Sequence, residues 1–137
     1  MISGIGVDLV DKARFINLVK KFGNRVAAKI LSKDEYLEYK NIANKPSFLS
    51  KRFAAKEALS KALGVGLYRK GIYPKYISVK HNDLGKPFLS LSSELKTIPY
   101  DHNIKIQLSI TDSDTQSIAF VVIESWVISK IILVIHL

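Results

Sequence analysis

The chain has 137 residues, of which 47% are hydrophobic, so it can form one domain with a buried core and is too apolar for a disordered protein. It contains no cysteine, which excludes disulfide scaffolds and thiolate metal sites and leads us to expect a cytoplasmic protein. Its net charge of +9 favours an anionic partner, such as a nucleotide cofactor, a nucleic acid, an anionic lipid or an acidic protein.

The first predicted element is a strand over residues 2–9, in which every second residue is apolar. The opposite face of this strand carries Gly4, Gly6 and Asp8. Glycines leave room for another backbone to approach closely, so we expect a second element to pack against this face. Asp8 would then lie at the strand end, beside whatever packs there.

Two helices should follow the strand. Asp11 can cap a helix that runs to Phe22, and Gly23 suits the position just past its end. Ser32 and Glu35 have the spacing of a capping box, which predicts that a second, short helix begins there.

The segment from Phe48 to Gly66 reads as one long helix that Ser47 can cap and Gly64 closes. At about 100° per residue, its bulky apolar side chains fall on one arc, and the side chains of Arg52 and Lys56 project from the middle of that arc.

Glu57 and Lys61 lie four residues apart on the flank of the same arc. An ordinary surface helix keeps charges off its apolar face, and burying a charge is costly unless a partner compensates it. We therefore predict that this helix faces a partly enclosed polar site with two cations, a carboxylate and a lysine. That composition is typical of a site that handles a polyphosphate with a metal ion.

The second half of the chain is rich in strand patterns. Four strands are predicted: Tyr76–Lys80, Phe88–Leu91, Ile104–Ile110 and Ser117–Glu124. A short helix, Ser92–Lys96, is predicted between the second and the third of them. We assign residues 1–124 to one domain and residues 125–137 to an apolar extension of unknown role. This extension is too short to span a bilayer. It could form an extra strand, a frayed end or a subunit contact. We favour a contact with a partner or subunit.

Asp8 and Glu57 are the candidate metal ligands. Mg²⁺ prefers oxygen ligands and commonly takes one or two carboxylates, with waters and substrate phosphates completing its shell. Alternatively, Asp8 pairs locally and Glu57 pairs with Lys61 along the helix.

Basic residues form two further groups. The helix cations Arg52, Lys56 and Lys61 could clamp phosphates, and alternatively their stems lie on the core with their charges in water. A second group of basic residues lies along and just after the first helix: Arg14, Lys21 and Arg25. An acidic helix of another protein could dock on these residues; alternatively, they form a face that is solvated by water alone.

Five motifs carry a resemblance to a known family. In chain order they are GIGVDLV at residues 4–10, RFAAKEA at 52–58, KALGVG at 61–66, GKP at 85–87 and LSI at 108–110, before a strand that ends at Glu124. This order and spacing closely resemble the short-type 4′-phosphopantetheinyl transferases, the holo-[acyl-carrier-protein] synthase family, over about residues 1–124.

The resemblance implies an α+β fold, with a long helix packed on an antiparallel sheet, and a homotrimer with its sites at subunit boundaries. It implies Mg²⁺-dependent transfer of 4′-phosphopantetheine from coenzyme A to a serine of apo-acyl carrier protein, which releases adenosine 3′,5′-bisphosphate and supports fatty acid biosynthesis.

The resemblance also implies roles for single residues. Asp8 and Glu57 would hold Mg²⁺, Lys61 would assist the leaving group, and Glu57 would accept the serine proton directly or through a water on the metal. The coenzyme A contacts would be Arg52, Lys56, Ser60, Gly64, Gly85, Lys86 and Pro87. The residues that dock the carrier protein would be Arg14, Lys21 and Arg25.

The chain departs from the family pattern at Asp112, where relatives commonly have histidine. An acid there would repel a phosphate unless a metal ion or a lysine lies nearby. An inactive trimeric relative of the family therefore stays open as an alternative. The positive charge and the scattered tyrosines keep a second alternative open, a small basic nucleic-acid-binding module.

Overall fold

The computed structural model describes residues 1–95 and 104–125. Its main sheet is antiparallel, has the strand order β1-β5-β4, and consists of β1 (Ile2–Asp11), β4 (Ile104–Asp112) and β5 (Gln116–Ser125). β5 is the central strand, and Leu9 of β1 lies opposite Ile118 of β5. The predicted strands are confirmed, and their alternating residues explain the pairing because one face of each strand is apolar.

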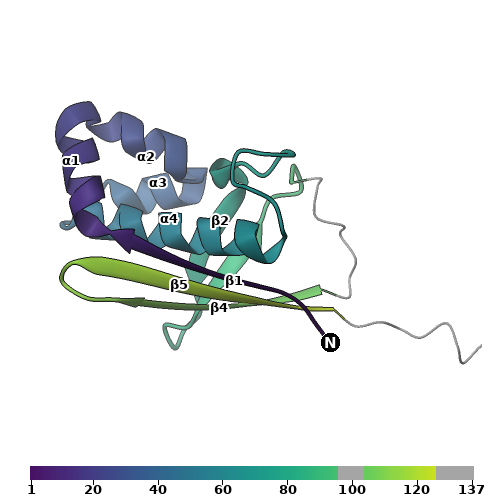
Figure 1. The fold of residues 1–137 in the computed structure, drawn as a ribbon. Helices are drawn as coiled ribbons and strands as arrows, with labels where there is room; N and C mark the ends of the chain where they lie inside the picture. Colours follow the sequence, from purple (N-terminus) through teal and green to yellow (C-terminus); the bar gives the residue numbers. More distant parts are fainter. Residues whose placement is uncertain (96–103, 126–137) are drawn as a thin grey trace, which may run out of the picture.

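Four helices follow β1 in the chain: α1 (Lys12–Phe22), α2 (Asn24–Ile30), α3 (Lys33–Tyr39) and α4 (Lys45–Ala62). α4 is the long predicted helix, and in Figure 1 it lies between the sheet and the layer formed by α1, α2 and α3. Gly23 has φ +57° between α1 and α2, which favours glycine and explains the break at the predicted place. No helix among residues 1–95 and 104–125 is long and apolar enough to cross a membrane.

A second, two-stranded sheet consists of β2 (Ile77–His81) and β3 (Pro87–Leu91), after the 3₁₀ helix η1 (Pro74–Tyr76). The side-chain oxygen of Asn82 accepts hydrogen bonds from the backbone of Leu84 and Lys86, which shapes the turn between the two strands.

Two predicted boundaries are wrong. α4 begins at Lys45, and its first turn is capped by the side chain of Asn44, which accepts a hydrogen bond from the backbone N–H of Ser47 (3.1 Å). Pro46 lies in the first helical turn, where proline is tolerated. Residues 92–95 form a turn instead of the predicted helix; residue 96 and the apolar tail from residue 126 lie outside the described residues.

The contact between β1 and α4 is a backbone contact, as the glycines predicted. A Cβ atom on Gly4 would lie 2.1 Å from the carbonyl oxygen of Ala62, and one on Gly6 would lie 1.9 Å from the carbonyl oxygen of Ala58. Real Cβ atoms do not approach this closely, so only glycine fits at either position. The helix therefore lies directly on the strand that carries Asp8.

Candidate active site

Asp8 lies beside α4 because of the way β1 crosses that helix. Gly4 faces Ala62 and Gly6 faces Ala58, so the strand and the helix run in opposite directions. Two strand residues advance about 6.7 Å and one helical turn about 5.4 Å. Asp8, two residues beyond Gly6 on the same face, therefore reaches the helical turn that carries Glu57.

Lys61 bridges the strand and the helix at this point. Its Nζ atom donates hydrogen bonds to the Asp8 carboxylate (2.9 Å) and to the carbonyl oxygen of Val7 (2.9 Å). The Asp8 side chain is 14% exposed, whereas that of Lys61 is 52% exposed. The ammonium group is therefore at the surface of the site and the carboxylate is inside it.

Glu57 is in an environment that disfavours its charge. Partial burial raises the pKa of its carboxyl group, and the charge of Asp8 raises it further, whereas Lys61 and Arg14 act in the opposite direction. A cation bound between Asp8 and Glu57 would relieve the repulsion between these two carboxylates.

The donor set fits Mg²⁺. Asp8 and Glu57 supply two hard oxygen ligands, which is the number of protein carboxylates that Mg²⁺ commonly takes. The described part of the chain contains no cluster of three or more acidic, histidine or cysteine side chains that could hold a metal ion. An ion bound here would therefore keep coordination positions for water and for substrate oxygens.

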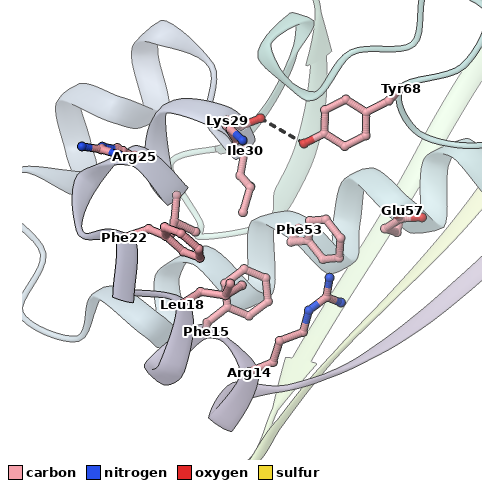
Figure 2. Close-up of a pocket in the computed structure, with 11 residues that line it drawn as sticks. Arg14, Phe15, Leu18, Phe22, Arg25, Lys29, Ile30, Phe53, Glu57 and Tyr68 are labelled. Atoms are coloured by element: carbon pink, nitrogen blue, oxygen red, sulfur yellow. Dashed lines mark hydrogen bonds between the residues drawn. The ribbon is translucent and has the colours of Figure 1, made fainter. Parts of the chain in front are cut away.

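A groove of about 550 Å³ opens on one side of Glu57. Figure 2 shows Glu57 and Tyr68 at one end of the groove and Phe22 and Arg25 at the other. The apolar walls of the groove come from α1, α2 and α4: Phe15, Leu18, Phe22, Val26, Ile30 and Phe53. Its basic lining residues are Arg14, Arg25 and Lys29. We call this cavity the apolar groove.

A second cavity, of about 430 Å³, lies past the end of α4. It is lined by three basic residues, two glycines and one valine: Lys61, Arg69, Lys70, Gly64, Gly66 and Val65. We call it the cationic pocket. Glu57 lines the apolar groove and Lys61, one helical turn later, lines the cationic pocket, so the acidic pair lies between an apolar cavity and a basic one.

Arg52 and Lys56 were predicted to face the same partly enclosed polar site as Glu57 and Lys61, but within this chain both lie buried in the core and neither lines the apolar groove or the cationic pocket. Lys56 is fully buried; it pairs with Glu35 and donates to the carbonyl oxygens of Ile30 (2.7 Å) and Pro74 (3.1 Å). Arg52 is also buried and lies close to Glu35.

Glu35 provides the charge that makes this burial possible. Its carboxylate accepts hydrogen bonds from the backbone of Ser32 (3.0 Å) and Val79 (2.9 Å) and pairs with both cations. Burial lowers the pKa of Lys56, and the charge of Glu35 opposes that shift. Tyr39 follows Glu35 by four residues, so both lie on the same face of their helix. Tyr39 is buried, and its position is the sequence signal that Glu35 faces the core.

The other residues that were predicted to contact coenzyme A lie in different places. Gly64 lines the cationic pocket, but Ser60 is buried and its hydroxyl donates to the carbonyl oxygen of Glu57 (2.8 Å). The turn at residues 85–87 joins β2 to β3 and lines neither the apolar groove nor the cationic pocket.

The predicted carrier-docking residues are all exposed. Arg14 and Arg25 line the apolar groove, whereas Lys21 lies outside it with its ammonium group over the ring of Phe22.

Asp112 has the lysine partner that its position requires. Lys12 Nζ lies 2.7 Å from its carboxylate, and this hydrogen bond holds the pKa of Asp112 below its usual range. Lys12 comes from the start of α1, one hundred residues earlier, so the sequence pattern could not identify this partner.

Three residues of the site were missed by the sequence reasoning: Tyr68, Arg69 and Lys70, which follow the GVG motif. The Tyr68 hydroxyl donates to the carbonyl oxygen of Lys29 (3.1 Å) across the apolar groove, as Figure 2 shows. Arg69 and Lys70 line the cationic pocket. The available signal was the pair of basic residues so soon after the glycines.

Comparison with known proteins agrees with this geometry. Residues 4–123 match the family model of the 4′-phosphopantetheinyl transferase superfamily. The holo-[acyl-carrier-protein] synthase of Dechloromonas aromatica is 42% identical over 124 residues, which cover 90% of this chain and 98% of the relative. The crystal structure of the holo-[acyl-carrier-protein] synthase from Neisseria meningitidis is similar with a TM-score of 0.85 and 40% identity, over 91% of this chain and all of that one.

A solved relative with a ligand is also similar. The holo-(acyl-carrier-protein) synthase of Bacillus anthracis, in complex with CoA (3′,5′-ADP), has a TM-score of 0.77 and 34% identity, over 92% of this chain and 99% of that one. Both the sequence match and the structural match therefore extend over almost the whole domain. The chain belongs to the 4′-phosphopantetheinyl transferase superfamily.

Proposed function

We propose that this chain transfers 4′-phosphopantetheine from coenzyme A to a serine of apo-acyl carrier protein and releases adenosine 3′,5′-bisphosphate. The observation that supports this most is the position of Asp8, Glu57 and Lys61 between the apolar groove and the cationic pocket. A protein substrate can approach from the first cavity and a phosphorylated one from the second. We expect the reaction to take place in the cytoplasm and to supply fatty acid biosynthesis.

Asp8 and Glu57 would hold the Mg²⁺ ion, which neutralises charge on the pyrophosphate when it is bound. The serine oxygen attacks the β-phosphorus of coenzyme A, and the bond from that phosphorus to the bridging oxygen breaks. Lys61 stabilises the negative charge that develops on the leaving phosphate. Glu57 is the residue that we propose takes the serine proton, directly or through a water.

The direct test is a transfer assay. The chain is incubated with coenzyme A, Mg²⁺ and an apo-acyl carrier protein, and the carrier is weighed by mass spectrometry. We expect a gain of one phosphopantetheine group, which is absent when a chelator is added or when the acceptor serine of the carrier is replaced by alanine. No gain would contradict the proposal; salt-sensitive nucleic-acid binding would then indicate a nucleic-acid-binding module, and its absence an inactive relative.

The apolar groove suits an amphipathic acidic helix of the carrier protein. Its apolar walls can bury the hydrophobic face of such a helix, and its basic residues match acidic side chains at the rim. Arg14, Lys21 and Arg25 are the residues that we propose for this contact.

Arg25→Glu is expected to raise KM for the carrier about tenfold at low ionic strength, because it puts a repulsive charge where an attractive one stood. KM for coenzyme A should stay unchanged, since Arg25 lies at the end of the groove away from Glu57. Steady-state kinetics at several salt concentrations measure both constants. Lys40→Glu, an equal charge change at an exposed position outside the groove, is the control; an equal effect in both variants would remove Arg25 from the docking surface.

We also propose that the chain forms a homotrimer through the sheet face opposite α4. This face exposes five large apolar side chains from two paired strands: Ile5, Val7, Leu9, Ile118 and Phe120. Contiguous apolar surface of this kind is typical of a protein interface. A neighbouring copy could also bring the Gly85–Lys86–Pro87 turn to a site that it does not reach within one protomer.

Val7→Asp and Phe120→Asp, which change directly opposed residues of β1 and β5, are each expected to convert the assembly to monomers and to lower transfer activity. Burying the introduced charge in the interface would be costly. Light scattering coupled to size-exclusion chromatography measures the mass. Leu37→Asp alters a residue that is 56% exposed on α3, away from the sheet, and should leave the mass unchanged; an unchanged mass in the two sheet variants would contradict the proposed interface.

A further inference from the structure

The start of α1 is held by the loop between β4 and β5. Asp11 precedes the helix, but its side chain makes no capping hydrogen bond to α1; it accepts one from the side chain of Gln116 (3.0 Å). The backbone N–H of Lys12, the first residue of α1, donates to the carbonyl oxygen of Thr115 (2.9 Å). The direction in which α1 leaves β1 therefore depends on contacts with a loop far along the chain.

The side chain of Lys12 adds a charged contact to the same loop. Its Nζ atom lies 2.7 Å from the carboxylate of Asp112 and also donates to the carbonyl oxygen of Ser113. The side chain of Lys12 is only 11% exposed. A cation in the first turn of a helix is disfavoured by the helix dipole, and burial adds to that cost. Asp112 offsets both costs, so the position of Lys12 depends on this carboxylate.

The same helical turn carries two residues of the apolar groove, Arg14 and Phe15. Phe15 is buried, and the centroid of its ring lies 5.5 Å from that of Phe53 on α4. The guanidinium carbon of Arg14 lies 5.2 Å from the centroid of the Phe53 ring, and Figure 2 shows this side chain directed toward Phe53. A shift of the first turn of α1 would therefore move Arg14 and Phe15 relative to the α4 wall of the groove.

We propose that Lys12 and Asp112 are positioning residues, whose ion pair fixes the first turn of α1 and so sets how the carrier protein docks in the apolar groove. This inference rests on the proposed function. Neither residue belongs to the described lining of the groove, so the pair acts through Arg14 and Phe15. The acidic pair on β1 and α4 is held by a separate backbone contact at Gly4 and Gly6, and its geometry does not depend on this ion pair.

Asp112→Asn and Lys12→Met each remove one charge and keep most of the side-chain volume. Each is expected to raise KM for the carrier about three- to tenfold, because a charged hydrogen bond that orients α1 is lost. In steady-state kinetics, kcat at saturating carrier and KM for coenzyme A should stay near the wild-type values. Partial unfolding would instead lower kcat, since it reduces the amount of active protein at every carrier concentration. Lys12→Arg keeps the charge and should retain most of the carrier affinity.

Two further measurements separate this role from a general loss of stability. The double variant Lys12→Met/Asp112→Asn should have a KM for the carrier no higher than the single variants, because the second change has no partner left to lose. Amide hydrogen exchange should become faster in α1 and stay unchanged in α4. Asp34→Asn, which removes one charge of the exposed pair with Lys80, is the control and should leave both quantities unchanged.

A wild-type KM for the carrier in both Asp112→Asn and Lys12→Met would overturn this inference. Additive effects in the double variant, or an equal rise of KM in Asp34→Asn, would overturn it as well. Each of these results can occur in a protein that transfers phosphopantetheine, and then only this inference fails. A wild-type chain without transfer activity would contradict the proposed function; unchanged hydrogen exchange in α1 of the two single variants would still show that the pair does not fix this helix.

Discussion

Replacement of either acidic residue at the β1–α4 contact should nearly abolish transfer: Asp8→Asn and Glu57→Gln are each expected to lower kcat/KM for coenzyme A by about 10²- to 10³-fold or more. Each change keeps the shape of the side chain and removes one of two negative charges that would hold the metal ion. The measurement is the mass-spectrometric transfer assay over a range of Mg²⁺ concentrations.

Folding of these variants provides the necessary control. Burial and the charge of Asp8 raise the pKa of Glu57, so the folded state favours its protonated form and gains stability as the pH falls through that raised pKa. The neutral Glu57→Gln side chain should therefore leave the Tm at neutral pH unchanged or slightly higher. Asp34→Asn, at an exposed acid paired with Lys80, should retain full activity. Near-normal turnover in Asp8→Asn or Glu57→Gln would contradict their role as ligands.

Gly6→Ala is expected to destabilise the fold by at least about 3 kcal/mol or to prevent folding, because a new Cβ atom would collide with backbone and not with a flexible side chain. The carbonyl oxygen of Ala58 lies 1.9 Å from the place of that atom. Urea denaturation followed by circular dichroism measures the free energy of unfolding. Ser3→Ala, on the same strand at an exposed position, is the control and should change this energy by less than about 1 kcal/mol.

The same substitution also tests how the site is held together. Any Gly6→Ala protein that folds must have β1 displaced from α4, which moves Asp8 away from Glu57 and Lys61. Its transfer activity at saturating Mg²⁺ should therefore fall even under conditions where it is fully folded. Wild-type stability and wild-type activity in Gly6→Ala would show that the strand does not lie on the helix as described.

Much of the fold could be predicted because its signals are local. The capping box of Ser32 and Glu35 forms as the spacing indicated, with both reciprocal hydrogen bonds present. Gly4 and Gly6 predicted a close backbone contact, and α4 provides it. The acidic pair was predicted as well, since Asp8 follows the glycines on the same strand face and Glu57 lies on the helix that packs there.

The environment of the helix cations could not be predicted in the same way. Arg52 and Lys56 looked like phosphate ligands because their charges fall inside the apolar arc of α4. Glu35, 21 residues before Lys56, pairs with both of them inside the core, and Glu38 also pairs with Arg52. The periodicity of one helix shows which residues are buried but not which residue of another element faces them. For the same reason, Arg69 enters the site through the conformation of a loop and not through a pattern in the sequence.

The central claim is that Asp8 and Glu57 bind one divalent ion together. Electron paramagnetic resonance of Mn²⁺, which replaces Mg²⁺ at oxygen sites, tests it most directly when the protein is titrated in the presence of coenzyme A. One bound Mn²⁺ per protomer is expected for the wild type, and binding should be strongly weakened in both Asp8→Asn and Glu57→Gln. Wild-type affinity in either variant would show that the two carboxylates do not share an ion.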